Sequence, residues 1–207
     1  MQKLLGYLRK AIQEFDLIQD GDRIAVGVSG GKDSVALLVG LHMLRRFIGI
    51  DYEIVALTLD PQFNKKETDY SQIQKLCDSL GIFYDIRRTH IGEIIFDIRK
   101  EEHPCSLCAR MRRGALHDAA KENNCNKLAL GHHYNDVVET FMMNLFSEGR
   151  LGCFSPKSYL SRKDITLIRP MVFAPEKDII SSVKRANLPI VKSICPADGV
   201  TNRQRMK

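Results

Sequence analysis

The sequence predicts an α/β protein with a doubly wound parallel sheet of about five strands and helices on both faces. Short apolar runs alternate along the chain with longer segments in which apolar residues recur at helical spacing. The first such unit joins a buried strand at residues 24–28 to a helix at 35–48 and a second strand at 53–59. With 207 residues, of which 44% are hydrophobic, the chain can bury roughly 70% of its unfolded surface as one domain, residues 1–207.

The remaining elements follow in order. An amphipathic helix is expected over residues 3–18, because leucines recur there at helical spacing and Gly21 follows. Residues 149–156 are rich in Gly, Pro and Ser and predict a loop. The other expected strands are residues 82–86, residues 127–130 and a segment that ends at 169–170. The other expected helices are residues 70–80, residues 110–123, a segment past residue 135 and residues 176–187.

The composition argues against membrane insertion and export. Residues 35–39, the longest uninterrupted apolar stretch, are far too few to cross a bilayer, and Lys3, Arg9 and Lys10 interrupt any signal peptide. Six cysteines in a chain of this length fall below the density of disulfide scaffolds. We therefore expect a cytoplasmic protein without a membrane partner, whose cysteines bind metal or take part in catalysis.

Positive charge is concentrated in the last part of the chain. Residues 148–207 hold twelve Lys and Arg against five Asp and Glu, whereas the preceding residues are near neutral. A basic region of this kind suits a polyanionic partner such as RNA, because each neutralised phosphate releases counterions. A solvated basic face without a partner is the equally weighted alternative.

A glycine-rich hexapeptide separates the first strand from its helix. It runs Ser29-Gly30-Gly31-Lys32-Asp33-Ser34, where parallel sheets bind ligands at the carboxyl ends of their strands. Glycines allow a tight turn, and amide groups at a helix start attract an anion. The hexapeptide is neither a Walker A loop nor G-x-G-x-x-G. Asp33 beside phosphates indicates bound Mg²⁺, or else it caps the loop amides.

This hexapeptide resembles the S-G-G-x-D-S signature of the PP-loop, or N-type ATP pyrophosphatase, superfamily. The resemblance implies a HUP-type fold that cradles the pyrophosphate of ATP and cleaves ATP between its α and β phosphates. It also implies that residues flanking the adenosine are Gly27 and, at the end of the second strand, Leu57, Leu59 and Asp60. Lys32 could neutralise charge on the leaving pyrophosphate.

A second motif, residues 131–136, follows the strand at 127–130. Asp136, Glu139 and Thr140 are three or four residues apart and share one face of a helix. Asp136 with Glu139 also fits a helix capping box. The segment matches the G-H-x-x-x-D-x-x-E-T pattern of the superfamily's tRNA-modifying members. That resemblance implies site roles for Gly131, His132 and Asp136, with Asp136 holding metal or orienting the reacting phosphate.

Three cysteines form the third candidate site. Cys105 and Cys108 open a helix as C-x-x-C, and Cys195 stands alone 87 residues later. Spacing leaves two alternatives open, a thioredoxin-like dithiol and a structural zinc whose fourth ligand is His103 or His117. Three further cysteines without partners at motif spacing are expected to be core or incidental thiols, namely Cys77, Cys125 and Cys153.

C-S-L-C followed by R-x-R-R-G, with one late cysteine, resembles the tRNA 2-thiocytidine synthetase family over nearly the whole chain. The resemblance implies a [4Fe–4S] cluster on Cys105, Cys108 and Cys195, with one iron open to bind a sulfide. Arg112 should face the same cavity and stabilise charge on an adenylated intermediate. The implied partners are tRNA and a sulfur donor, either a cysteine desulfurase or free sulfide, and a homodimer is an alternative to a monomer.

The predicted reaction adenylates the C2 oxygen of an anticodon-loop cytidine and replaces it by sulfur. Asp136, Arg112 and Lys32 are the predicted catalytic residues. Two rival functions share some of the motifs: a tRNA-lysidine synthetase-like ligase, which needs no cysteine triad, and a zinc-stapled module that binds ATP without turnover. The last residues, 202–207, match the beginning of a final helix that usually extends further in the family, so a truncated or short variant is expected.

Overall fold

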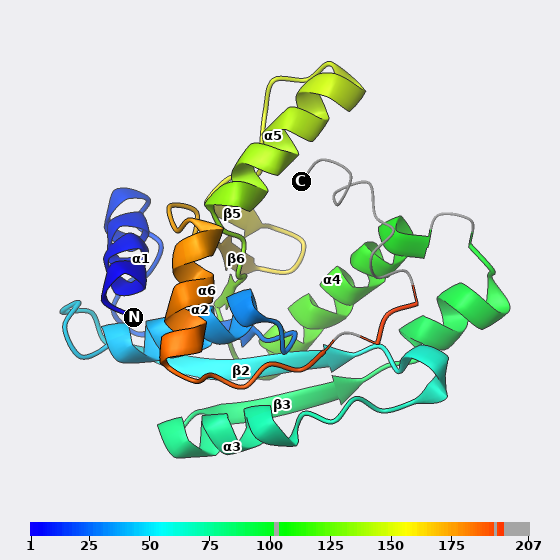
Figure 1. Cartoon of the computed structure of the whole chain (residues 1–207), viewed down its shortest axis with the longest axis horizontal. Coiled ribbons are helices and arrows are strands. Elements are labelled where there is room, and N and C mark those ends of the chain that lie inside the picture. The colour runs from blue at the N-terminus through cyan, green and yellow to red at the C-terminus, as the bar shows by residue number, and fades with distance from the viewer. Residues whose placement is uncertain (102–103, 193, 197–207) are drawn as a thin grey trace.

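The computed structural model describes residues 1–101, 104–192 and 194–196, in which helices and strands alternate as predicted (Figure 1). The strands are β1 Asp22–Gly27, β2 Tyr52–Asp60, β3 Phe83–Arg88, β4 Lys127–Ala129, β5 Lys157–Leu160 and β6 Ile165–Ile168. The helices are α1 Gln2–Glu14, α2 Lys32–Leu44, α3 Ser71–Leu80, α4 Pro104–Glu122, α5 Tyr134–Glu148 and α6 Glu176–Arg185. Two short segments of other helical types are η1 Phe63–Lys65 and η2 Glu93–Ile98.

The six strands form one sheet in the order β3-β2-β1-β4-β6-β5. Every neighbouring pair is parallel except β5 with β6, which is antiparallel. The predicted class is confirmed, with one strand more than the roughly five expected. The additional strand is β5, an edge strand whose side chains are half-buried or exposed. It therefore lacks the apolar run by which the other strands are recognised.

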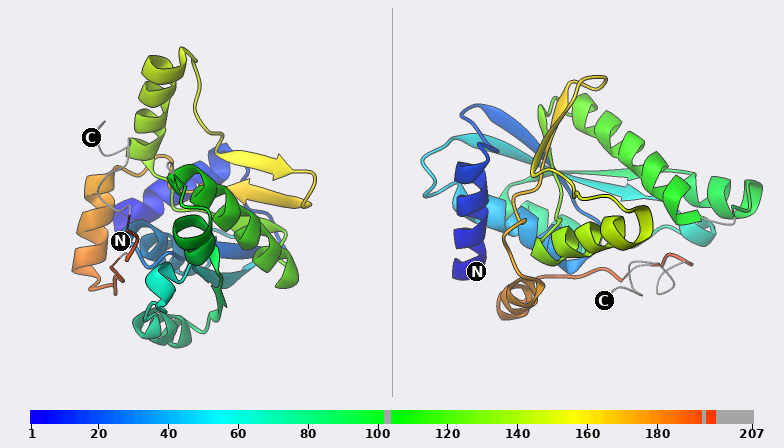
Figure 2. Two further views of the ribbon diagram at one scale, coloured as in Figure 1. Left: turned by 90° about the vertical axis from the view of Figure 1, so that its right-hand side faces the viewer. Right: turned by 90° about the horizontal axis from the view of Figure 1, so that it is seen from above.

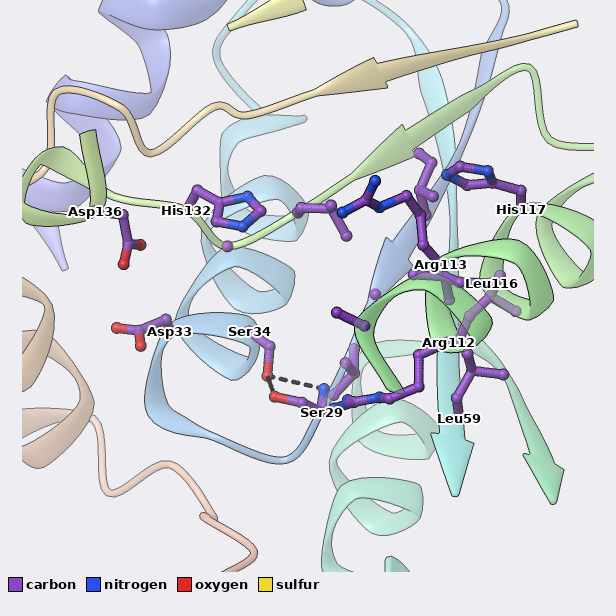
Figure 3. A pocket seen from close by; sticks show the side chains of 17 residues that line it. Ser29, Asp33, Ser34, Leu59, Arg112, Arg113, Leu116, His117, His132 and Asp136 are labelled. Carbon is purple, nitrogen blue, oxygen red and sulfur yellow. Dashed lines mark hydrogen bonds between the residues drawn. The ribbon is translucent and has the colours of Figure 1, made fainter. Parts of the chain in front are cut away.

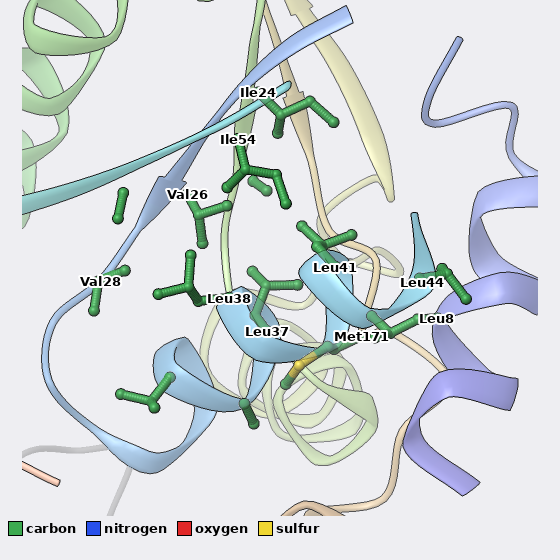
Figure 4. Close-up of a cluster of buried hydrophobic side chains, with 14 of the residues drawn as sticks. Leu8, Ile24, Val26, Val28, Leu37, Leu38, Leu41, Leu44, Ile54 and Met171 are labelled. Atoms are coloured by element: carbon green, nitrogen blue, oxygen red, sulfur yellow. The ribbon is translucent and has the colours of Figure 1, made fainter. Parts of the chain in front are cut away.

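Helices cover both faces of the sheet (Figure 2). Ile24 and Val26 of β1 point to the face covered by α1, α2, α3 and α6, and the intervening Ala25 points to the face covered by α4. This alternation follows from the two-residue period of a strand. The larger core lies on the first face, where leucines of α2 pack against β1 and β2 (Figure 4).

Two helix boundaries differ from those predicted for physical reasons. The first helix ends at Glu14 because Asp16 adopts a left-handed conformation with φ 47°. Leu17 and Ile18 are nevertheless buried, so their apolar spacing extends the helical pattern beyond the helix. The helix predicted at residues 110–123 begins at Pro104, which places the C-x-x-C pair inside its first two turns.

Helix α5 differs from the other helices in its surroundings. It extends away from the sheet, and none of its residues is fully buried (Figure 1). Phe141 and Phe146 are 37% and 70% exposed. None of the helices in the described ranges combines the length and the apolar character that crossing a bilayer requires.

The strand order places the reversal of winding direction beside β1. From β1 the chain continues through β2 and β3 on one side, and β4 then pairs with β1 on the other side. The carboxyl ends of these strands are in register, with Gly27 opposite Leu57 and Val26 opposite Ala129. Open parallel sheets bind ligands at such a reversal, and the candidate site lies there.

Candidate functional site

A cavity of about 440 Å³ opens at the carboxyl ends of β1, β2 and β4 (Figure 3). Its wall combines residues of the phosphate loop, the second motif and helix α4. The predicted site residues that line it are Gly27, Ser29, Asp33, Ser34, Leu57, Leu59, Arg112, Gly131, His132 and Asp136. Residues that came from three separate sequence motifs therefore surround one space.

The phosphate loop is a tight turn that delivers backbone amides to the start of α2. The Ser29 N–H donates to Ser34 Oγ at 3.1 Å, and Ser34 Oγ donates to the Gly31 carbonyl at 2.9 Å. Gly30 has φ +83°, a conformation that L side chains rarely adopt. The positive end of the α2 dipole faces the same space, so the loop is built to bind an anion.

Lys32 is held between two carboxylates. Its Nζ lies 2.9 Å from Asp33 Oδ2 and 2.9 Å from Glu176 Oε1. Burial acts to lower the Lys32 pKa, but the hydrogen bonds to Glu176 and Asp33 raise it above its ordinary value. The Glu176 N–H donates to Asn135 Oδ1 at 3.0 Å, which fixes the start of α6 against α5. Lys32 is therefore charged and is held by its neighbour Asp33 and by Glu176 from a distant segment.

Gly131 lets the second motif approach the phosphate loop closely. A Cβ at residue 131 would lie 3.1 Å from the Asp33 carbonyl carbon and 3.2 Å from the Ser34 amide nitrogen. These neighbours are backbone atoms, which cannot rotate out of the way as a side chain can. A glycine at this position is thus a consequence of packing, and it brings His132 and Asp136 to the cavity.

Two aspartates approach the buried ring of His133. Its Nε2 lies 3.8 Å from Asp33 Oδ1 and 3.7 Å from Asp136 Oδ2. Asp33 Oδ1 is buried without a hydrogen-bond partner among the described residues. Asp136 accepts the His133 N–H at 2.9 Å. The capping box at the start of α5 therefore pairs His133 with Asp136. The capping box expected between Asp136 and Glu139 is not formed.

The region predicted to hold adenosine has apolar walls. Leu57 and Leu59 line the cavity, and a Cβ on Gly27 would lie 3.1 Å from Leu130 Cδ2. Asp60 does not line the cavity. Its buried carboxylate instead accepts hydrogen bonds from the Thr68 N–H and hydroxyl and from the Gln62 N–H. Asp60 thus fixes the loop that follows β2.

Two consecutive arginines of α4 project into the cavity (Figure 3). Arg112 extends towards Ser29, and Arg113 extends towards His132. His117, one turn further along α4, is 7% exposed, and its Nε2 has no hydrogen-bond partner among the described residues. Burial, and then the charge of Arg113, lower the His117 pKa. The face of α4 that borders the cavity is therefore basic.

Two of the three predicted cluster ligands share one environment, and the third, Cys105, is exposed in the first turn of α4. Cys108 is buried in an apolar cluster with Phe63 and Ile95, and Cys195 packs against the same cluster. Burial raises the pKa of the Cys108 thiol, the charge and hydrogen bond of Arg112 lower it, and Cys195 and Cys105 raise it. The fold thus brings the late cysteine to the C-x-x-C pair.

The donor chemistry fits an iron–sulfur cluster better than the alternatives. Cys108 and Cys195 share apolar surroundings beside Arg112, Cys105 lies one turn before Cys108, and the thioredoxin-like alternative does not account for Cys195. For zinc, the candidate fourth ligand His117 lines the nucleotide cavity, and His103 lies outside the described residues. In the described ranges no group of three His, Cys, Asp or Glu side chains is arranged closely enough to hold a metal ion.

The other cysteines have the character of ordinary thiols. Cys77 and Cys125 are buried, and burial raises their pKa to about 12 and about 11. Cys153 is exposed, and its thiol donates to the Val137 carbonyl at 3.3 Å. High thiol pKa values make the two buried residues poor metal ligands and poor nucleophiles.

Sequence reasoning missed several residues of the site. These are Arg113, His133, Asn135 and Glu176, whereas His117 was considered only as a zinc ligand. Three of them stand beside a residue that was recognised, so adjacency to a motif was the available signal. Glu176 gave no such signal, because it reaches Lys32 from the far end of the chain.

The sheet order and the phosphate loop define the class of protein. The chain matches the family profile of the PP-loop domain over residues 4–206 and belongs to that family. In structure it is similar to the U34-tRNA thiolase NcsA from Methanococcus maripaludis with its [4Fe–4S] cluster, with TM-score 0.79 and 25% identity, over 99% of this chain and 69% of that one. A phosphoadenylyl-sulfate reductase from Candida auris, with TM-score 0.55 and 8% identity over 89% of this chain and 81% of its own, shares the fold alone.

Sequence relatives define the family more closely. The chain is 41% identical over 199 residues to a tRNA-cytidine(32) 2-sulfurtransferase from Citrifermentans bemidjiense, covering 96% of this chain and 77% of the relative. It is 43% identical over 210 residues to the protein of that name from Syntrophotalea carbinolica, covering 100% and 79%. The chain belongs to the family of tRNA-cytidine(32) 2-sulfurtransferases.

Proposed function

We propose that this chain is an ATP-dependent tRNA sulfurtransferase that converts an anticodon-loop cytidine to 2-thiocytidine. The observation that carries the proposal is one cavity bordered by the phosphate loop, the second motif and the arginine-bearing face of α4, with Cys105 and Cys108 at the start of that helix and Cys195 packed in the cluster that holds Cys108. The names of its relatives favour sulfur transfer over ligation of lysine. A module that only binds ATP would not need the cysteines.

The first step is adenylation of the base. ATP lies with its triphosphate on residues 29–34 and its adenosine between the apolar residues at the ends of β1 and β2. The C2 oxygen of the cytidine attacks the α phosphorus, the bond between that phosphorus and the bridging oxygen breaks, and pyrophosphate leaves. Lys32 and the loop amides stabilise the negative charge of the leaving group.

Asp33 and Asp136 would hold Mg²⁺ on the triphosphate. Both carboxylates approach the same atom of His133, and Asp33 has a buried oxygen without a hydrogen-bond partner in the described part of the chain. A cation there offsets the repulsion between carboxylate and phosphate. This pairing supports the predicted role of Asp136 in orienting the reacting phosphate.

In the second step sulfur replaces the adenylated oxygen. Sulfur bonds to C2, the bond between C2 and oxygen breaks, and AMP leaves. Cys105, Cys108 and Cys195 would hold a [4Fe–4S] cluster, which when bound would present the donor's sulfide to the base. Arg112 is near enough to Cys108 for its charge to lower the pKa of that thiol, and it lines the nucleotide cavity, so the same charge can stabilise the departing AMP.

We further propose how the whole chain is used. Residues 1–207 act as one domain, and the basic residues 148–207 contact the tRNA backbone, although 193 and 197–207 lie outside the described residues. A cysteine desulfurase or free sulfide supplies sulfur in the reducing cytoplasm. Homodimer formation also remains a prediction.

The experiment that tests the function compares two exposed cysteines. We expect Cys105→Ala to lose the visible absorbance of the cluster and the formation of 2-thiocytidine but to keep its affinity for ATP. The matched control is Cys153→Ala, which should behave as wild type. The measurements are spectra of anaerobically purified protein, calorimetric ATP binding and mass spectrometry of nucleosides from treated tRNA. If Cys105→Ala kept both cluster and thiolation, the assignment would be wrong.

A further inference from the structure

Two arginines near the cavity, Arg113 and Arg169, have no role in the proposed chemistry. Arg113 is exposed and extends from α4 towards His132 (Figure 3). Arg169 directly follows β6, whose last residue pairs with Ala129 of β4. The chain continues from β4 to His132, so Arg169 and His132 both lie just beyond the carboxyl ends of two neighbouring strands.

Arg169 is only 9% exposed and is held in place from two sides. Its Nη1 donates to the Ser155 carbonyl, and its guanidinium lies over the Phe154 ring at 4.9 Å. The ring of His132 packs against the same Phe154 at 5.1 Å. Arg169, Phe154 and His132 therefore form a continuous set of contacts that reaches the cavity wall.

Among the described residues no carboxylate balances the charges of the two arginines. In the described ranges neither Arg113 nor Arg169 forms an ion pair with a carboxylate, and the buried Nε of Arg169 has no hydrogen-bond partner there. Burial, and then the charge of Arg113, lower the Arg169 pKa. A buried cation without an anion is costly, and a second cation nearby adds to the cost. A bound anion would offset both contributions.

We propose that Arg113 and Arg169 bind a phosphodiester of the substrate RNA next to the target base. The triphosphate of ATP already has its own donors in the loop amides, Lys32 and Arg112, so a further anion at this wall belongs to a second molecule. Arginine suits a phosphate because its guanidinium donates two parallel hydrogen bonds. The contact positions the strand without reading its sequence. The inference rests on the proposed function, in which RNA is the second substrate.

Binding measurements on Arg113→Ala test this inference, because an exposed side chain can be removed without disturbing the fold. Replacing Arg113 should weaken tRNA binding by about tenfold and reduce the slope of log affinity against log salt concentration by about 1. ATP affinity should stay within about twofold. The matched control is Arg110→Ala, an exposed arginine on the same helix that does not line the cavity. The measurements are tRNA binding by fluorescence anisotropy at several salt concentrations and ATP binding by calorimetry.

The outcomes separate this inference from the proposed function. Weaker ATP binding with unchanged tRNA binding would assign the two arginines to ATP, and unchanged binding of both ligands would mean that they bind no phosphate. Either result overturns the inference while thiolation activity stands. Wild-type protein that fails to bind tRNA at all would overturn the proposed function together with the inference. Arg113→Lys should restore most of the salt slope but only part of the affinity.

Discussion

At the scale of single residues, the charge on Lys32 is controlled by its neighbours. Without ATP, the ammonium group of Lys32 contacts the carboxylate of Asp33. It also contacts Glu176, which lies in the first turn of α6. Two carboxylates neutralise the lysine and also repel an incoming triphosphate. Glu176 therefore sets how much of the Lys32 charge is available to the nucleotide before a divalent cation binds.

Replacing Glu176 by Gln should strengthen ATP binding in the absence of Mg²⁺ by about fivefold. Removing one negative charge near the phosphates relieves repulsion of about 1 kcal/mol, and the amide oxygen can still accept a hydrogen bond from Lys32. Calorimetry in the presence of a chelator measures the effect. Glu53→Gln, at the start of β2, serves as the control. Weaker binding by Glu176→Gln would show that this carboxylate helps to hold the nucleotide.

Site residues that lie within a contiguous motif could be predicted from the sequence, but their partners from distant parts of the chain could not. The lining residues Ser29, Ser34 and His132 were all recognised from contiguous patterns. Asp60 was expected at the nucleotide because it ends a strand at the correct edge. In the structure both carboxylate oxygens of Asp60 instead accept hydrogen bonds from Thr68 and Gln62. Local sequence does not contain the loop partners that a buried carboxylate will find.

At the scale of elements, two close backbone contacts hold the site together. Gly131 allows the segment after β4 to touch the first turn of α2. The segment after α6 crosses the phosphate loop, where the Val191 N–H donates to the Gly30 carbonyl at 3.0 Å. The same segment continues to Cys195, which packs beside Cys108. The contact with the phosphate loop and the late cysteine are therefore only four residues apart in the sequence.

Gly131→Ala should reduce kcat/KM for ATP by at least about tenfold, because the added methyl group forces the two motifs apart and misplaces the reacting groups. The change in melting temperature should be small beside the loss of activity. Gly114→Ala is the matched control, since a Cβ there meets nothing within 4 Å and alanine favours a helix. Steady-state pyrophosphate release and thermal unfolding check both variants. Equal activity of the two variants would contradict the importance of this contact.

The order of elements was predictable because strands and helices carry their own periodicity. The central strands β1 and β2 contain buried apolar runs, whereas the edge strand β5 reads Lys-Ser-Tyr-Leu and has no buried residue. Helix α4 begins at the C-x-x-C pair, which was expected to open a helix, and ahead of residues 110–123, where the apolar periodicity placed it. Packing of Cys195 on that helix depends on a chain path that no local pattern encodes.

At the scale of the whole molecule, the fold brings two kinds of chemistry to one side of the sheet. The carboxyl edge of the strands holds the nucleotide cavity, and helix α4 extends from the cavity wall to the cysteines. The basic C-terminal part adds charge for a polyanion. This arrangement lets an activated base meet its sulfur source without leaving the protein, which gives adenylation and sulfur transfer a common site.

The central claim is that the oxygen removed from the base leaves on AMP. The most direct measurement uses tRNA whose target cytidine carries a heavy oxygen isotope at C2, incubated with ATP, a sulfur donor and the protein. Mass spectrometry of the nucleotide products should find the label in the phosphate of AMP, in proportion to the 2-thiocytidine formed. Label released into water, with unlabelled AMP, would contradict adenylation of the base as the step that activates it.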